Sequence, residues 1–259
     1  MKSSQGEIWK GTSSRYRQID VPLYRFPSFP CSCGNHPGDT EEGPRKSERK
    51  QSERSPLHNQ TNRERKKRKR EMTEYEKMLR GEVYYAADQE LKDMLNRCKD
   101  LCWEYNHLRP SLLKERNRKL QEILGSCDED TFINQPFLCD FGKHIRVGKH
   151  FFANFNLVVL DEALVTIGDH CFIGPNVSIY TACHSIIPQE RNTRDEWARP
   201  VTIGHNVWIG GSVTILPGVT IGDNVTIGAG SVVVKDIPSD SLAVGNPARV
   251  VKHIPVKGQ

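Results

Sequence analysis

The sequence predicts a mainly β fold, a parallel β-helix of short stacked strands that follows a small helical module. Two observations carry this prediction. From residue 141 to residue 236 an apolar side chain recurs at every sixth position, and from 72 to 125 apolar side chains recur with the 3.6-residue period of an α-helix. Residues 1–71 show neither period. We therefore expect a tail at 1–71, a helical module at 72–125 and a β-helix domain at 126–259.

The tail is expected to be disordered. Between Cys31 and Arg70 the only large apolar residue is Leu57, so this stretch buries too little apolar surface to offset the entropy lost on ordering. Met72 begins a stretch that resembles the start of a complete protein. The tail is therefore either an upstream extension of the folded part or a segment that is not translated.

The positive charge of the chain belongs to the tail. The whole chain has a formal net charge of +5, but residues 1–71 hold 17 Lys and Arg against 9 Asp and Glu, which leaves −3 for residues 72–259. Residues 63–70 alone carry seven bases and one acid. Such a run is a solvated tail, a nuclear-import signal or a weak contact with a polyanion such as nucleic acid. The net charge therefore gives no indication that the folded part binds nucleic acid.

Neither membrane insertion nor secretion is expected. No run of about 18 apolar residues is present, and the N-terminus lacks the apolar segment of a secretory signal. The eight cysteines show no spacing typical of a disulfide framework, which favours a reducing, cytoplasmic setting. Cys31, Cys33 and His36 lie close together in the tail, but no second pair of ligands follows, so we expect no zinc site there.

The helical module begins with two predicted helices. Thr73 and Glu76 have the spacing of a capping box, and Gly81 is a natural stop for the first helix. Asp88 is the expected cap of the second helix. The apolar residues of this second helix fall on one stripe, which contains Leu91, Met94, Leu95, Cys98, Leu101, Cys102 and Tyr105.

A third helix is expected after the break at Pro110. Ser111 is its predicted cap and Gly125 its end, and its apolar positions are Leu113, Leu120, Ile123 and Leu124. In the second helix, Cys98 and Cys102 lie one turn apart on the apolar stripe. We interpret them as small buried hydrophobes, with a pair of metal ligands as the alternative.

The six-residue period runs in three series. Its members are Phe141, Val147, Ala153 and Val159, then Ile167, Ile173 and Ile179, then Ile203, Ile209, Ile215, Ile221, Ile227 and Val233. A period of six indicates one short strand and one tight turn per unit, with the aliphatic side chain in a narrow core and Gly or Asn at the turns. Three units make a triangular coil of about 18 residues, and strands of successive coils pair in parallel.

Two interruptions break the period. Two residues are inserted between Val159 and Ile167, around Asp161 and Glu162. A longer polar stretch, CHSIIPQERNTRDEWARP at residues 183–200, separates the second series from the third. Long polar loops that interrupt a regular repeat usually carry function, so we expect the functional site at this loop.

Several strings of the sequence carry a family resemblance. They are MTEYEKMLRGEVYYAAD in the helical module, HFFANFNLVVLD and YTACHSI up to the long loop, and VTIGHNVWIGG, VTIGDNVTIGAGSVVVKDIP and VGNPARVVK after it. Over residues 72–254 the chain resembles the maltose and galactoside O-acetyltransferase family. The resemblance implies a left-handed β-helix, acetyl-CoA as co-substrate, a sugar such as maltose or glucose as acceptor, and a homotrimer with active sites between neighbouring β-helices.

The resemblance implies that His184, in the string TACHSI, is the catalytic histidine. A sugar hydroxyl is a poor nucleophile until its proton is removed as it attacks the thioester of acetyl-CoA. An imidazole titrates near the working pH, so it can accept that proton and return it to the departing thiolate, a contribution of roughly 10²–10⁴ in rate. No covalent acyl-enzyme is needed.

The resemblance also assigns residues to the two substrates, and no metal site is implied. The positions for the sugar acceptor are Asn154, Asp161, Asp140 and Trp208. The positions for acetyl-CoA are Gly211, Ala229 and Val234 along the pantetheine arm and Lys235, Arg249 and Lys252 near the phosphates. Each has a structural alternative as a turn residue, a corner-packing residue or a solvated surface charge.

Two positions depart from the family pattern. Ala86 stands where galactoside enzymes have an acid that contacts the acceptor, and Asp140 stands where they have a serine. We therefore expect an acceptor pocket that differs from that of a galactoside enzyme. The strings YYAAD and TACHSI are more similar to the maltose branch, and the natural acceptor stays undetermined.

Two other functions stay open on the sequence. A zinc enzyme of the γ-class carbonic anhydrase type needs three imidazoles around the metal, and the candidates are His144, His150, His170, His184 and His205. The other is a non-catalytic β-helix scaffold, or a nuclear protein that uses its basic tail. Metal analysis tests the first, and salt-dependent nucleic-acid binding that is lost without residues 1–71 tests the second.

Overall fold

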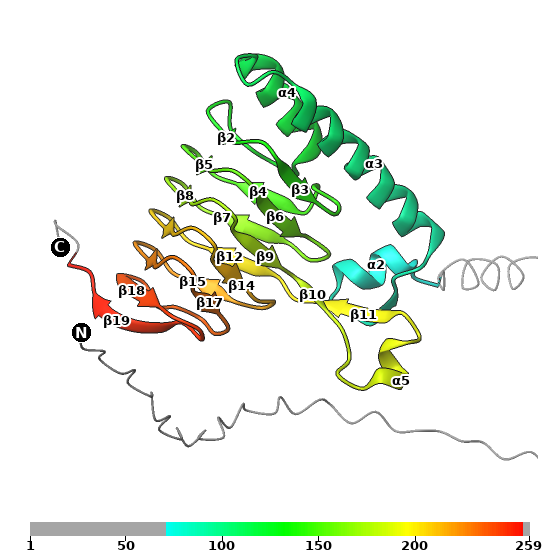
Figure 1. Cartoon of the computed structure of the whole chain (residues 1–259). Helices are drawn as coiled ribbons and strands as arrows, with labels where there is room; N and C mark the ends of the chain where they lie inside the picture. Colours follow the sequence, from blue (N-terminus) through cyan, green and yellow to red (C-terminus); the bar gives the residue numbers. More distant parts are fainter. Residues whose placement is uncertain (1–70, 256–259) are drawn as a thin grey trace, which may run out of the picture. The chain divides into compact units, whose positions relative to one another are not determined.

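The computed structural model describes residues 71–255, which form a column of stacked β-strands with helices packed at one end (Figure 1). The predicted fold class, mainly β with stacked parallel coils after a small helical module, is confirmed. The expected disorder of the tail, the basic run at 63–70 and the cluster from Cys31 to His36 lie outside the described residues. Within residues 71–255, no helix has the length and apolar character needed to span a bilayer.

Three sheets form the sides of the column. The first sheet contains β4 (Ile145–Val147), β7 (Val165–Ile167), β12 (Val201–Ile203) and β15 (Thr220–Ile221). The second contains β2 (Phe132–Ile133), β5 (Phe152–Ala153), β8 (Phe172–Ile173), β13 (Trp208–Ile209), β16 (Thr226–Ile227), β18 (Ser241–Val244) and β19 (Arg249–His253). The third contains β3 (Phe137–Cys139), β6 (Leu157–Leu160), β9 (Ser178–Tyr180), β14 (Thr214–Ile215) and β17 (Val232–Val233).

Aliphatic side chains from the three sheets fill the column. In the first sheet the parallel register aligns Ile203 with Ile167 on one side and Ile221 on the other. The second and third sheets repeat this arrangement, and the aligned side chains are at most 3% exposed. Full burial of such a side chain contributes about 1.5–3 kcal/mol, so each coil is stabilised mainly by the coils above and below it.

The prediction that Phe141 begins the repeat is wrong. The inward position of that coil is Cys139, which pairs with Val159 in the third sheet. Phe141 is instead buried in a separate cluster with Met78, Tyr84 and Leu91. The six-residue period assigned Phe141 to the inward position because the true inward residue is a cysteine and two inserted residues follow it.

The irregularities of the coil lie at one corner, between the third sheet and the first. Paired residues of the first sheet are 20 positions apart in the early coils and 18 apart in the last, so each early coil has two extra residues. These extra residues lie within 140–144 and 161–164, each time between a strand of the third sheet and the next strand of the first. The long loop, residues 181–200, leaves the column at the same place (Figure 1). We call this corner the insertion corner.

Side-chain ladders stabilise the other two corners. Asn206 and Asn224 both have φ of 56°, a left-handed conformation that Asn tolerates better than most residues. The amide of Asn206 donates to Asn224 at 3.1 Å, and the amide of Asn224 donates to Asp240 at 2.8 Å. At the remaining corner the amide of Asn156 donates to Asn176 at 3.0 Å. The turns are therefore tied from coil to coil along the column.

The helical module has the first two predicted caps. Thr73 and Glu76 form the capping box of α2 (Glu74–Leu79), and Asp88 accepts a backbone hydrogen bond at the start of α3 (Gln89–His107). The predicted cap at Ser111 is wrong, because Leu112 precedes α4 (Leu113–Ile123) and no side chain caps this helix.

A small antiparallel sheet joins the long loop to the helical module. Strands β10 (Ala182–Cys183) and β11 (Asp195–Ala198) form the two sides of the loop, with α5 (Pro188–Arg191) between them. Strand β1 (Tyr84–Tyr85) pairs with β11, and the register places Tyr84 opposite Glu196. The loop is thus held by main-chain pairing to a segment about 100 residues earlier in the chain, which fixes the positions of its side chains.

Candidate active site

The long loop places His184 at the insertion corner. Its side chain is 55% exposed, and its Nε2 atom lies 3.3 Å from Oε2 of Glu196 on β11. The other carboxylate oxygen of Glu196 accepts a hydrogen bond of 2.6 Å from the hydroxyl of Tyr84, which is buried. These three residues form a chain of one hydrogen bond, from Tyr84 to Glu196, and one ion-pair contact, from Glu196 to His184, that runs from the protein interior to the solvent.

The surroundings of Tyr84 fix the direction of its hydrogen bond to Glu196. Burial, together with the hydrogen bond to Glu196, raises the pKa of Tyr84 well above its usual range, so Tyr84 stays protonated and donates to the carboxylate. A carboxylate only accepts hydrogen bonds, so a neutral imidazole that faces Glu196 through its Nε2–H keeps the lone pair on Nδ1. A histidine in this state can take a proton from a hydroxyl group that approaches Nδ1.

A hollow of about 380 Å³ opens beside His184. Its lining consists of Ala86, Ala87, Lys92, His184, Arg191, Arg194 and Glu196. The bases at its rim offer several hydrogen-bond donors, and Glu196 and His184 offer acceptors. The two alanines contribute only methyl groups. The hollow is therefore suited to a small ligand that carries several hydroxyl groups.

A second groove, of about 490 Å³, crosses the second sheet. One wall is a column of aromatic rings, because the register stacks Phe152, Phe172 and Trp208 on successive coils. Phe172 and Trp208 are more than half exposed. At Gly210 an added Cβ atom would lie 2.6 Å from the backbone nitrogen of Ala229, so glycine is needed for the coils to approach this closely.

The hollow and the groove lie on opposite sides of the column. Each coil passes from the first sheet to the second, then to the third, and returns to the first at the insertion corner. The insertion corner is therefore opposite the second sheet. A single chain does not bring His184 to the groove.

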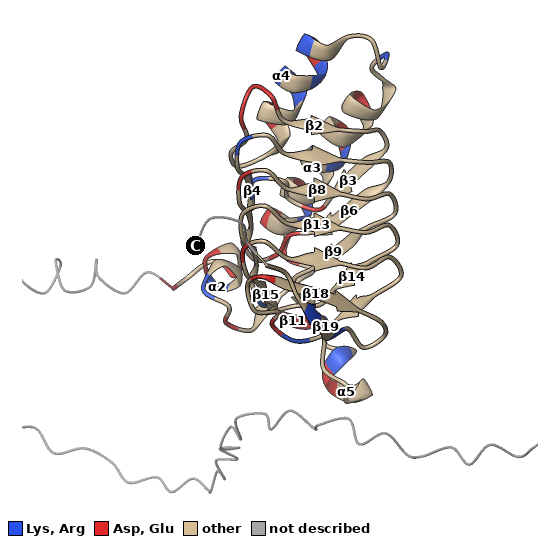
Figure 2. Ribbon diagram, turned by 90° about the vertical axis from the view of Figure 1, so that its left-hand side faces the viewer, with Lys and Arg blue, Asp and Glu red and all other residues tan. Residues whose placement is uncertain are grey.

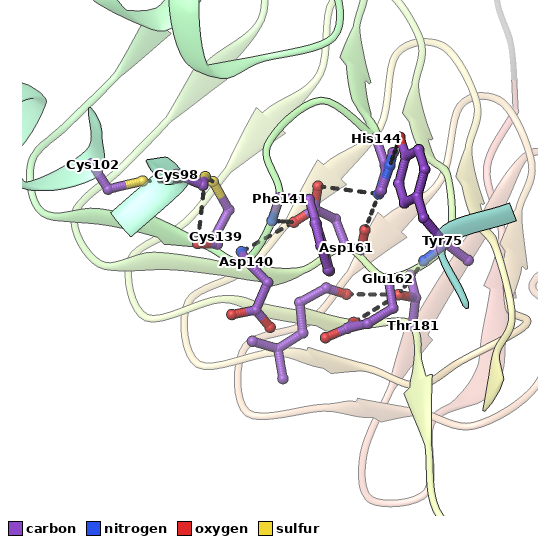
Figure 3. Close-up of polar contacts among 12 residues, drawn as sticks. Tyr75, Cys98, Cys102, Cys139, Asp140, Phe141, His144, Asp161, Glu162 and Thr181 are labelled. Atoms are coloured by element: carbon purple, nitrogen blue, oxygen red, sulfur yellow. Dashed lines mark hydrogen bonds and ion pairs between the residues drawn. The ribbon is translucent and has the colours of Figure 1, made fainter. Parts of the chain in front are cut away.

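Buried acids support the insertion corner (Figure 3). Oδ1 of Asp161 accepts from the backbone N–H groups of Asp140 (3.1 Å) and Phe141 (2.9 Å), and Oδ2 has no hydrogen-bond partner among the described residues. Burial raises the pKa of Asp161 to about 7. Glu162 accepts from the hydroxyl of Thr181 at 3.2 Å, and burial, with the neighbouring carboxyl of Asp140, raises its pKa as well.

The raised pKa of Asp161 predicts a pH dependence of stability. In the unfolded chain this carboxyl ionises near 3.8, and in the fold near about 7, so over this range the folded state binds the extra proton. The free energy of unfolding is therefore expected to fall by roughly 4 kcal/mol as the pH rises from about 4 to about 7. Asp161→Asn keeps an oxygen for the two backbone donors, and we expect urea titrations to show a fall that is smaller by about this amount, with a remainder that comes from the raised pKa of Glu162.

The control for this prediction is Asp169→Asn. Asp169 is a partly exposed acid whose pKa is lowered, chiefly by a backbone hydrogen bond from Lys149, so its removal leaves the fall in stability in place. A slope that persists unchanged in Asp161→Asn would contradict a buried, protonated carboxyl at this position.

Three family models match the described part of the chain. The maltose acetyltransferase hexapeptide capping motif matches residues 77–128, the hexapeptide repeat of succinyl-transferase matches 164–186, and the bacterial transferase hexapeptide (six repeats) matches 200–235. Galactoside O-acetyltransferase of Escherichia coli is 40% identical over 179 residues, which are 69% of this chain and 88% of that protein.

Solved structures of acetyltransferases are also similar to this chain. A maltose O-acetyltransferase from Clostridium difficile has a TM-score of 0.71 and 49% identity over 71% of this chain and 99% of its own. The chain belongs to the maltose and galactoside O-acetyltransferase family. A hexapeptide-repeat-containing acetyltransferase from Vibrio cholerae, complexed with acetyl coenzyme A, has a TM-score of 0.64 and 39% identity over 71% of this chain and all of its own. The chain is thus an acetyltransferase of the hexapeptide-repeat type.

In this acetyltransferase the residues assigned by resemblance divide between the hollow and the groove. His184 lines the hollow, whereas Asn154, Trp208, Gly211 and Ala229 line the groove. The acids assigned to the acceptor line neither: Asp161 is fully buried, and Asp140 is half-buried beside it.

The positions assigned to the far end of acetyl-CoA lie toward the last coils of the acetyltransferase. Lys252 on β19 pairs with Leu242, which lines the groove, and Arg249 lies on the same exposed strand. Val234 and Lys235 follow β17 in the third sheet and line neither the hollow nor the groove.

Sequence reasoning missed Glu196 and Tyr84. Nothing in the string RDEWARP distinguishes Glu196 from the other charges of the loop, and Tyr84 lies about 110 positions before it. The signal exists only in the antiparallel register of β1 and β11, which places the two residues opposite each other. The histidines considered for zinc show no such convergence, because among residues 71–255 no three of them come within ligand distance of one another.

Proposed function

We propose that this protein transfers the acetyl group of acetyl-CoA to a hydroxyl of a sugar such as maltose or glucose, with His184 as the general base. The observation that carries the proposal is the chain from Tyr84 through Glu196 to His184 at the edge of the hollow. The carboxylate orients the imidazole and stabilises the imidazolium that forms when the hydroxyl loses its proton. The imidazolium then returns the proton to the thiolate of coenzyme A.

The lining of the hollow supports a sugar acceptor. Lys92, Arg191 and Arg194 offer donors to hydroxyl oxygens, and no acid stands at Ala86 to contact a galactoside. This arrangement favours an acceptor of the maltose or glucose type. Asp161 is assigned a supporting role in this proposal, because its buried carboxyl group holds the backbone of the insertion corner.

The groove supports the placement of acetyl-CoA. Its apolar wall and glycine-rich floor suit the pantetheine arm, with Gly211 and Ala229 lining it and Asn154 and Trp208 at its side. The exposed bases Arg249 and Lys252 lie on the strand beside the end of the groove, where they suit the phosphates of the nucleotide. Val234 and Lys235 lie outside the groove of their own chain, and we assign them to the acetyl-CoA site that is shared with the neighbouring subunit.

A homotrimer would unite the two parts of the site. The hollow and the groove lie on opposite sides of one chain, so the long loop of one subunit must approach the second sheet of the next. The strands of the second sheet from β2 to β18, and all strands of the third, contain no Lys, Arg, Asp or Glu (Figure 2). Uncharged faces with exposed Phe172 and Trp208 are typical of surfaces that bury one another.

An acetyl-transfer assay tests the proposed reaction. The purified full chain is supplied with acetyl-CoA and with maltose, glucose or a galactoside in turn, and the free thiol of coenzyme A is measured over time. We expect release of the thiol to depend on maltose or glucose, with one acetyl ester per thiol in the NMR spectrum of the product. Release that does not depend on any sugar would contradict the proposal.

Mixed trimers test the shared site. His184→Ala and Trp208→Ala are each expected to be weakly active alone, because each leaves every site with one defective part. When the two variants are unfolded together in equal amounts and refolded, about a quarter of the sites combine an intact His184 with an intact Trp208 from a neighbour. We expect acetyl transfer to recover to about that fraction. The control is a chain that carries both substitutions, refolded in the same way with unaltered chain. Failure of the first mixture to recover acetyl transfer would contradict a site between subunits.

A further inference from the structure

Three cysteine sulfurs meet between the helical module and the first coil (Figure 3). Cys98 and Cys102 lie one turn apart on α3, and Cys139 ends β3. The sulfur of Cys139 lies 3.6 Å from each of the other two, and all three lie within 4.8 Å of one another. All three are free thiols, and the proposed acetyl transfer uses none of them.

The spacing of the sulfurs matches a trigonal site. A metal–thiolate bond of about 2.3 Å places three sulfurs in one plane about 4 Å apart. Two of the separations in this cluster are slightly shorter than that value, and the third is no more than 4.8 Å. Residues at i and i+4 share one face of a helix, so Cys98 and Cys102 point the same way, and Cys139 approaches them from the neighbouring strand. An ion between them would be held by two elements of the fold.

The surroundings discriminate between metals. The three side chains are 2–6% exposed and belong to the main apolar core. No His, Asp, Glu or fourth Cys among residues 71–255 joins the cluster. Structural zinc takes four ligands, whereas soft ions such as Cu(I) prefer sulfur. Three sulfurs without a fourth side-chain donor, in an environment that excludes water, therefore favour the soft monovalent ion.

We propose that Cys98, Cys102 and Cys139 form a three-coordinate thiolate site for Cu(I). The ion keeps its oxidation state, and each thiol that binds it releases one proton to the solvent, so affinity is expected to fall as the pH falls. Since the ion would join α3 to β3, its expected effect is on the stability of the helical module.

Copper binding tests this proposal in the full chain. Cys31 and Cys33 offer a second pair of thiols, so both are replaced by serine in every sample. The protein is loaded with Cu(I) without oxygen and dialysed against bicinchoninate, a chelator of Cu(I), and copper per chain is measured. We expect one copper per chain, its loss in Cys102→Ala, and its retention in Cys171→Ala, since Cys171 is equally buried but lies outside the cluster.

X-ray absorption of the loaded protein gives a test that needs no core variant. Three sulfur neighbours around copper, and a rise in the melting temperature on loading, support the site even if Cys102→Ala does not fold. Protein that gives up its copper to the chelator overturns the proposal. So does copper that stays bound in a folded Cys102→Ala variant, or a metal shell that contains nitrogen or oxygen. Preferential retention of zinc over Cu(I) in the same competition overturns it too.

Discussion

Replacing His184 with alanine is expected to lower the turnover number for acetyl transfer by roughly 10²–10⁴, the usual contribution of a general base. The KM values for acetyl-CoA and for the sugar should change far less, because the groove and most of the lining of the hollow are untouched. Steady-state kinetics of thiol release with maltose or glucose measure both quantities. A loss of less than about tenfold would contradict the role of His184 as a base.

His205→Ala is the matched control for this prediction. The side chain of His205 is 57% exposed and lies 3.5 Å from the carboxylate of Asp169, so it resembles His184 in exposure and in its acidic partner, but it lines neither the hollow nor the groove. We expect its turnover number to stay close to that of the unaltered protein. A comparable loss in both variants would indicate damage to the fold.

Glu196→Gln separates orientation of the imidazole from its chemistry. The amide preserves the size of the side chain but removes the negative charge 3.3 Å from Nε2. Without that charge the imidazolium is less stable, so the acidic limb of the pH–rate profile for kcat/KM, where the base becomes protonated, should shift to lower pH. The rate at neutral pH should fall less than in His184→Ala. A profile that keeps the same midpoint would contradict a carboxylate paired with the catalytic base.

Replacing Ile221 with alanine is expected to lower the free energy of unfolding by about 2–5 kcal/mol, because it leaves a cavity in the narrow core between the sheets. Ile221 is 1% exposed and is aligned with Ile203 in the coil below it. The loss should be large because the core of the coils is narrow and its side chains are almost fully buried, so neighbouring coils have little freedom to close the gap. Urea titration followed by circular dichroism measures the change.

Thr220→Ala is the control, since Thr220 precedes Ile221 in the same strand and its side chain points outward into solvent. We expect a change within about 0.5 kcal/mol for this surface position. Equal effects at the two positions would contradict an alternation of inward and outward side chains along this strand.

The regular part of the fold was predictable because each strand of each coil needs a buried aliphatic side chain at its inward position. From Ile203 to Val233 every inward position is aliphatic, so the six-residue period alone locates the strands. The prediction was wrong at Phe141, because the inward position of that coil is Cys139, two residues earlier, and an insertion follows it. At α4 the expected cap at Ser111 is absent, because the chain enters this helix through Leu112 without a side-chain hydrogen bond.

The candidate site was predictable only in part. Motif resemblance singled out His184, and the polar interruption of the repeat indicated the loop that carries it. Its partners could not be found in this way, because Glu196 and Tyr84 come together through pairing between distant strands. The cluster of Cys98, Cys102 and Cys139 has the same origin: the helical period brings two sulfurs together, but the third comes from a strand 37 positions after Cys102.

The two ends of the column determine whether its terminal coils can pair with other molecules. A stack of parallel coils has no natural last member, and a bare terminal coil would offer unpaired N–H and C=O groups to the next molecule. At one end α3 and α4 cover the first coil. At the other, β19 reverses direction against β18 with a shift in register, and carries Arg249 and Lys252 on its outer edge. Charged, irregular edges discourage further strand addition. The helices α3 and α4 at one end and strand β19 at the other therefore limit the column to a fixed number of coils, whereas uncovered ends would pair with further molecules.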